Sequence, residues 1–190
     1  KRVDATCDYA LYMLAPRLAE RAQLIELGDL LTRRSPSSIY GALLRQQVFI
    51  TYQQNGNHAR ALALAEDDIR SNRANVDMLL YAASKAYERQ DRAKVTLYAK
   101  KLIEGLASLP QPEGVNSAEW ARQRATQQGL AHWMLGMMAS TGQRWPDADI
   151  HLRAALPHVG QNKAMSAEVL YHLALANLKL GEAKNDQRRI

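Results

Sequence analysis

Apolar and small residues recur along this chain at spacings of three to five residues, which is typical of helices that bury one face. In the segment that begins at residue 57, Asn57 is a candidate N-cap, and Ala61, Ala65 and Ile69 follow on one side of a helix. Alanine and leucine dominate the composition, while aromatic residues make up only 6% of it. Both features favour helices packed through small residues over β-sheets, so the chain is predicted to be all-α.

Proline, asparagine and glycine mark the ends of the predicted helices. Two helices are expected between residues 5 and 34, separated near Pro16, because proline interrupts a helix with its ring and its missing N–H. Ser35 then predicts the cap of a third helix with Pro36 in its first turn, and Asn55-Gly56 predicts the turn that ends it. Further candidate N-caps are Asn57, Asn75, Asp91 and Asn116.

The predicted helices repeat with a period of 34 residues. Shifting the segment 57–69 by this period gives a second cap and a second set of small or apolar residues, at Asp91, Val95, Ala99 and Ile103. The same shift carries Phe49 to Ala83 and Tyr52 to Ala86, so both helices of a pair recur. A helix-turn-helix unit of this length is typical of helical repeat arrays.

A segment rich in proline and glycine, residues 108–115, interrupts this register and is predicted to be a loop. Asn116 and Glu119 follow as a candidate capping box, and the small and apolar residues from Trp120 to Ala139 predict one long helix of roughly 25 residues.

The period returns in the second half of this long helix, displaced by the insertion. Leu135-Gly136 lies in the first helix of the pair and Ala148 in the second, with Pro146 in the first turn of that second helix. The last helix is expected to begin after Ser166 and to end at Gly181.

The end of the chain carries a recognisable order of residue types, at Ala167, Glu168, Tyr171, Leu173, Ala176, Lys179 and Gly181. Together with the period, this order resembles the first helix of a tetratricopeptide repeat. The Leu-Gly pair of the family motif stands at Leu135-Gly136, and the small residue of its second helix stands at Ala61 and Ala148. The signature Trp is replaced by Arg45, Leu79, His132 and Leu170, and the proline between repeats by Arg73, Ala107 and Gly160.

The resemblance implies an all-α fold, a right-handed α-solenoid of antiparallel helix pairs, built as a single domain over residues 1–190. The expected parts are a divergent N-terminal helical pair (1–41), three repeats (42–75, 76–109 and 129–162), an insertion with a helix extension (110–128), and a last helix with a polar tail (163–190). Degenerate helical hairpins of other solenoids are close competitors of this interpretation.

In tetratricopeptide arrays the first helix of each pair lines a concave groove, which the family generally uses to hold peptides or partner proteins. Helical spacing then predicts the residues that face this groove, which are Gln46, Ile50, Leu80, Ser84, Tyr87, Trp133, Met137, Tyr171 and Leu175. Most of the set is large and apolar or aromatic, which suits the anchoring of a partner segment. Leu80 and Leu175 fit the core equally well, whereas Trp133 and Tyr171 are amphipathic and favour the groove.

The formal net charge of +6, from 25 Lys and Arg against 19 Asp and Glu, brings nucleic acid into consideration as a partner. The basic pairs Arg33-Arg34, Lys100-Lys101 and Arg188-Arg189 are predicted to lie near helix ends, where cations suit the helix dipole. No helix carries an evident set of base-reading side chains. A basic regulatory domain associated with nucleic acid therefore stays an alternative, and a protein or peptide partner is favoured.

The residue types that carry catalysis do not fall into known patterns here. The five histidines, at 58, 132, 151, 158 and 172, lack metal-binding spacing and are interpreted as surface or helix-packing residues. No nucleophile, nucleotide or dinucleotide motif is present, and Asp67-Asp68 and Asp147 with Asp149 fit dipole and solvation roles. The sequence predicts no enzyme, no catalytic residue, no metal and no cofactor.

The ends of the sequence leave its context open. No stretch approaches the roughly 18 apolar residues that a membrane span needs, and the first residues lack a signal-peptide core. The sequence begins at Lys1 rather than Met, so it leaves open whether a targeting segment precedes it. It also leaves open whether the location is cytoplasmic or periplasmic. Cys7 is the only cysteine, so no internal disulfide forms.

Residues 182–190 are too short and polar to supply a helix that covers the last repeat, and solenoid ends normally need capping. We therefore expect either a longer polypeptide or self-association at this end. The leading hypothesis is a non-catalytic scaffold that holds a partner segment through apolar anchors. An accessory repeat region of a larger enzyme or envelope assembly is a further alternative.

Overall fold

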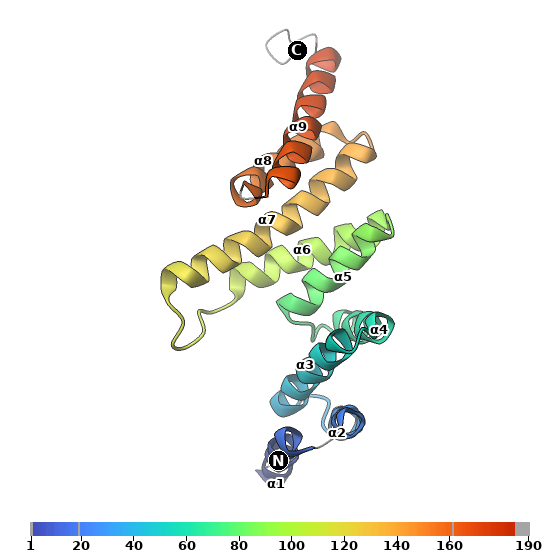
Figure 1. Cartoon of the computed structure of the whole chain (residues 1–190), viewed down its shortest axis with the longest axis vertical. Helices are drawn as coiled ribbons and strands as arrows, with labels where there is room; N and C mark the ends of the chain where they lie inside the picture. Colours follow the sequence, from blue (N-terminus) through green and yellow to red (C-terminus); the bar gives the residue numbers. More distant parts are fainter. Residues whose placement is uncertain (1, 19, 161, 185–190) are drawn as a thin grey trace. The chain divides into compact units, whose positions relative to one another are not determined.

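The chain folds into helices throughout the residues that this computed structural model describes, which are 2–18, 20–160 and 162–184 (Figure 1). Those residues contain no strand, so the all-α prediction is confirmed. A short 3-10 turn, η1 (Ala15–Arg17), interrupts the helical pattern at Pro16, as expected. The α-helices are α1 (Arg2–Leu14), α2 (Arg21–Arg34), α3 (Ile39–Gln54), α4 (His58–Arg70), α5 (Val76–Glu88), α6 (Arg92–Ser108), α7 (Ser117–Thr141), α8 (Trp145–Val159) and α9 (Lys163–Lys184).

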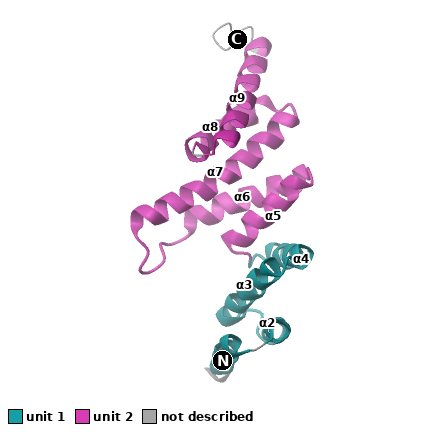
Figure 2. Ribbon diagram, in the orientation of Figure 1, with its two compact units in different colours: residues 1–73 teal, residues 74–190 magenta. Residues whose placement is uncertain are grey.

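Residues 1–73 form one compact unit and residues 74–190 a second (Figure 2). The boundary falls between α4 and α5, about where the first two predicted repeats were expected to meet. In the first unit, α3 packs against α1, α2 and α4. In the second unit each helix packs on the next, and α7 also contacts α5 and α9. A single domain over residues 1–190 stays a prediction.

The three turns that join the two helices of a pair share one geometry, and the turn between α4 and α5 adopts it as well, at Asn72 (φ 54°). Each of the three turns has a residue with positive φ, namely Gly56 (68°), Gln90 (57°) and Gln143 (56°). The next residue donates its backbone N–H to a carbonyl in the last turn of the preceding helix: Asn57 to Tyr52 (2.8 Å), Asp91 to Ala86 (2.9 Å) and Arg144 to Ala139 (2.9 Å). This is the Schellman arrangement, which satisfies carbonyl groups that a helix end leaves free.

The N-caps predicted at Asn57, Asn75, Asp91 and Asn116 are confirmed. Backbone N–H groups donate to the side-chain oxygens of Asn57 (from Arg60, 3.4 Å), Asn75 (from Met78, 2.9 Å) and Asp91 (from Lys94, 3.1 Å). Asn116 accepts from Ala118 (2.9 Å) and Glu119 (3.3 Å), and the helix that it caps, α7, has 25 residues as expected. The caps at 57 and 91 are therefore equivalent across the 34-residue shift.

Two helix starts differ from the prediction. Helix α3 begins at Ile39 and not at Ser35, because the Ser35 hydroxyl donates instead to Asp8 Oδ1 of α1 at 3.1 Å. Helix α9 begins at Lys163 and not after Ser166, because the Asn162 side chain accepts from the Met165 N–H at 3.2 Å and so acts as the cap.

The basic pairs follow the dipole argument only in part. Arg33-Arg34 forms the last turn of α2, as predicted. Lys100-Lys101 lies in the middle of α6, so its prediction near a helix end is wrong. The pair at 188 and 189 lies outside the described residues.

The interface within each helix pair uses equivalent positions in all three repeats. On the second helices, one position has no exposed surface in any repeat, at Ala61, Val95 and Ala148. The position one turn later is just as deeply buried, at Ala65, Ala99 and Leu152. Because most of these residues are small, the two helices of a pair can pack closely.

Helix α7 approaches α8 closely at two glycines, Gly129 and Gly136, and at Gly136 the approach includes the α8 backbone. A Cβ built at Gly136 would lie 2.7 Å from Leu152 Cγ and 3.1 Å from the Leu152 backbone nitrogen. Gly105 in α6 has more room, because the nearest atoms to its Cβ would be side-chain carbons at 3.7 and 4.0 Å.

We predict that Gly136→Ala lowers the free energy of unfolding by roughly 1–3 kcal/mol, because the overpacking cost exceeds the gain of about 1 kcal/mol in helix propensity. Gly105→Ala is the matched control and should be neutral or slightly stabilising. Chemical denaturation of both variants measures the difference, and equal stabilisation by the two substitutions would contradict the close approach.

Candidate functional site

The predicted groove residues of the second unit lie on α5, α7 and α9, the first helices of their pairs, which pack side by side. Tyr87 of α5 and Trp133 of α7 stack with ring centroids 4.7 Å apart and planes tilted by 47°. Burial raises the pKa of Tyr87, and the carboxylate of Glu168 in α9 raises it further. The surface over these three residues, one from each helix, is named here the first-helix face.

Trp133 belongs both to the first-helix face and to the core. It and Tyr87 are half-buried and pack against a core cluster of the second unit that includes Met137, Val169 and Leu173. The indole N–H of Trp133 is buried and has no hydrogen-bond acceptor within the described part of the chain. A buried donor without an acceptor costs about 1–3 kcal/mol. An acceptor from a bound segment, such as a backbone carbonyl, would recover this cost if it reached the indole.

The other predicted residues of the second unit differ in exposure. Tyr171 is 65% exposed. Leu80, Ser84 and Leu175 are half-buried, and the Ser84 hydroxyl donates to the Leu80 carbonyl at 2.9 Å. Met137 is only 3% exposed and lies in the core cluster. Tyr171 is therefore the most exposed residue of the set in the second unit, and Met137 is the most deeply buried.

Gln46 and Ile50 lie on α3 in the first unit and are described separately for that reason. Ile50 is exposed and Gln46 is half-buried. Two further exposed apolar residues, Ile39 and Leu43, stand on the same side of α3 at helical spacing. Their spacing to Gln46 and Ile50 was the signal that could have added them to the predicted groove residues.

One equivalent position of the first helices is filled differently in each helix pair, by Arg45, Leu79 and His132. Arg45 is buried, and its guanidinium donates to both carboxylate oxygens of Asp68 in α4, from Nε at 3.0 Å and from Nη2 at 2.8 Å. Arg73 adds a contact to the same carboxylate at 3.2 Å. Asp68 is 2% exposed, so the solvation role predicted for it is wrong. A buried carboxylate needs such paired cations.

His132 pairs with His151 of α8, which the sequence reasoning did not foresee. Their Nδ1 atoms are 3.0 Å apart, so one ring donates its N–H to the other, and the ring that accepts is neutral. Burial lowers the pKa of each histidine, and for His132 the neighbouring His151 and His158 lower it further. For His151, the Asp147 carboxylate acts in the opposite direction, and the cations of Lys100 and Arg144 lower the pKa.

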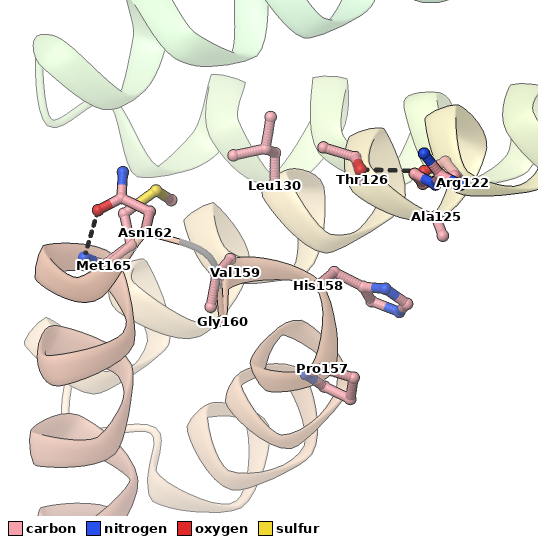
Figure 3. Close-up of a pocket in the computed structure, with 10 residues that line it drawn as sticks. All are labelled: Arg122, Ala125, Thr126, Leu130, Pro157, His158, Val159, Gly160, Asn162 and Met165. Atoms are coloured by element: carbon pink, nitrogen blue, oxygen red, sulfur yellow. Dashed lines mark hydrogen bonds between the residues drawn. The ribbon is translucent and has the colours of Figure 1, made fainter. Parts of the chain in front are cut away.

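A hollow of about 400 Å³ lies where α7 extends beyond α8 (Figure 3). Its walls come from α7, from the end of α8 and from the start of α9: Arg122, Ala125, Thr126, Leu130, Pro157, His158, Val159, Gly160, Asn162 and Met165. The Thr126 hydroxyl and the Asn162 side chain are engaged with backbone groups of their own helices. Arg122 and His158 add a guanidinium and an imidazole to these walls.

No model of a known protein family matches the chain, and no curated protein sequence matches it. Within the ranges that the structure describes, no group of three or more His, Cys, Asp or Glu side chains could hold a metal ion. None of the described helices has the length and apolar character to cross a membrane.

The contact between Arg45 and Asp68 yields a double-mutant prediction. Arg45→Leu should lower the free energy of unfolding by about 3–5 kcal/mol, because it removes the closest cation from a buried carboxylate. Arg45→Leu with Asp68→Leu should recover most of this loss, because Leu79 and Leu102 occupy the same places in the next pair. Denaturation curves give the coupling energy. A single variant no less stable than the double variant would contradict the buried ion pair.

The histidine pair predicts a pH dependence of stability. Both folded pKa values lie below the ordinary value of 6.5, so the unfolded chain binds more protons than the folded chain as pH falls. The contribution of the two histidines to stability is therefore fully present above pH 6.5 and is lost as pH falls below it. Thermal unfolding between pH 7.5 and about 5 measures this loss.

The control for the pH dependence is His132→Leu with His151→Leu, since Leu79 and Leu64 stand at the equivalent places in other repeats. The double variant should lose less stability on acidification than the native chain. An unchanged pH profile would show that the pair does not carry the effect.

Proposed function

We propose that the chain is a non-catalytic scaffold of the tetratricopeptide type, which holds a segment of a partner protein against its first helices. The observation that carries the proposal is the first-helix face, where the stacked Tyr87 and Trp133 lie near Glu168. Aromatic residues with a buried body and a polar tip are common anchors in protein interfaces.

The superhelical arrangement is part of the proposal. It is supported by the recurring Schellman turns, by equivalent N-caps at Asn57 and Asp91, and by side-by-side packing of α5, α7 and α9. In such an arrangement the second helices lie on the outside, and the first helices form the surface to which a segment can bind along its length.

The chemistry of the face indicates the kind of segment that it would take. The raised pKa of Tyr87 keeps its hydroxyl protonated at neutral pH, so it can donate or accept. Glu168 contributes a negative charge, and Tyr171 one helical turn later contributes an exposed ring. We infer a segment with one or two apolar side chains that bears a basic residue next to them.

Peptide selection tests this proposal directly. Displayed random peptides would be selected on the immobilised chain, and the affinities of enriched peptides measured by fluorescence polarisation. Tyr171→Ala and Tyr87→Ala should each weaken binding by roughly ten- to hundredfold, as expected for anchors that contribute about 1–3 kcal/mol. Trp133 is left intact because it packs against the core cluster. Tyr87 packs against the same cluster, so a loss of binding by Tyr87→Ala counts only where thermal unfolding shows that the variant is folded.

The matched control variants are Leu97→Ala and Ile150→Ala, which remove exposed apolar side chains (51% and 62% exposed) from the second helices α6 and α8. Their affinities should stay within about twofold of the native value. Equal losses in control and face variants would overturn the proposal. So would binding restricted to nucleic acid, recognised by a fall in affinity of several orders of magnitude between low and moderate salt.

A further inference from the structure

Helix α9 carries apolar residues on two opposite sides. One side packs into the second unit, where Val169, Leu173 and Ala176 are buried. The other side carries four residues that are named here the outer stripe: Ala167, Leu170, Ala174 and Leu178. The first three are exposed, and Leu170 has 52% of its surface free. A helix that is apolar on both sides is typically covered on both.

The other helix pairs show what covers this side of a first helix. Leu170 and Ala174 stand at the places that His132 and Gly136 occupy in α7. In α7 those residues contact the second helix α8, through the histidine pair and through the close approach to Leu152. No helix among the described residues covers the outer stripe of α9 as α8 covers the equivalent side of α7. The natural occupant of the outer stripe is therefore an antiparallel helix with small and apolar residues.

We propose that this occupant is α9 of a second copy of the chain. The two helices would run antiparallel and cross at Ala174, whose small side chain permits close approach. Leu170 of one copy would then lie opposite Leu178 of the other, so that the stripe covers itself. The same surface is used on both sides, as a two-fold symmetric dimer requires.

Charges at the two ends of the stripe favour the antiparallel arrangement. Lys163 lies one turn before Ala167, and Glu182 lies one turn after Leu178, and both are exposed. Antiparallel pairing places each lysine near the glutamate of the other copy, whereas parallel pairing would bring like charges together. Glu182 already accepts from Lys179 in its own helix at 2.8 Å, and a carboxylate can accept from a second ammonium group as well.

The size of the interface sets its strength. One helix pair is small beside the roughly 1,200–2,000 Å² that stable complexes bury, so the dimer should be reversible and should form with increasing concentration. The inference does not rest on the proposed function. Tyr171 lies between the outer stripe and the first-helix face, so the test uses residues farther from that face.

The test is sedimentation equilibrium of the whole 190-residue chain from low micromolar to near-millimolar concentration. The average mass of the native chain should rise towards twice that of the monomer. Ala174→Glu should abolish the rise, because it places a charge at the crossing point. Ala121→Glu, at an exposed alanine of α7, should leave the rise unchanged. A native chain that stays monomeric throughout, or an Ala174→Glu variant that associates as the native chain does, would overturn the proposal.

Charge exchange tests the orientation without disturbing the fold. Lys163→Glu should weaken association severalfold, and Lys163→Glu with Glu182→Lys should restore it. In a Cys7→Ser background, Ala174→Cys should form a disulfide-linked dimer on oxidation, whereas Ala121→Cys should not. Failure of both the restoration and the cross-link would exclude an antiparallel α9 pair. Because Ala174→Glu leaves the first-helix face intact, peptides selected on that face should still bind this variant, so the two proposals fail separately.

Discussion

The close approach of two helices within each pair is the constraint on which the rest of this fold depends. Small residues stand at most of the places where the helices touch, and the positions of Ala61 and Ala65 recur in the later pairs with no exposed surface. Once one side of each first helix is committed to this contact, only the remaining sides can meet neighbouring helices or solvent. The first-helix face and the outer stripe are both products of this commitment, on two different sides of the first helices.

Much of the fold could be predicted from the sequence because its signals are local. An asparagine or aspartate that caps a helix and a residue with positive φ that ends one each act within a few residues, and Asn57, Asp91 and Asn116 were recognisable for this reason. The 34-residue period then extended each local signal to its equivalents. The two wrong helix starts arose where a competing group took over the cap, since Ser35 is engaged with α1 and Asn162 acts in place of Ser166.

The site was less predictable because exposure is decided by packing between distant segments. Register alone placed Tyr87 and Trp133 on the same surface, and they do stack. The helical spacing could not show that Met137 is buried in the core while Tyr171 is exposed, because it assigns both residues to the same side of their helices. The pairing of His132 with His151 was missed for a related reason, since the two residues are 19 positions apart and match no metal or catalytic spacing.

The single repeat position held by Arg45, Leu79 and His132 gives the three helix pairs different chemistry at one structural point. The helix pair that contains Arg45 gains stability relative to the other two on heating, because the cost of desolvating charges falls with temperature. The pair closed by leucine weakens on cooling, because hydrophobic stabilisation fades. The pair closed by imidazoles weakens on acidification. Cold and acid therefore select different segments of the same chain for local opening, whereas heat spares the ionic pair, and hydrogen exchange would reveal these differences.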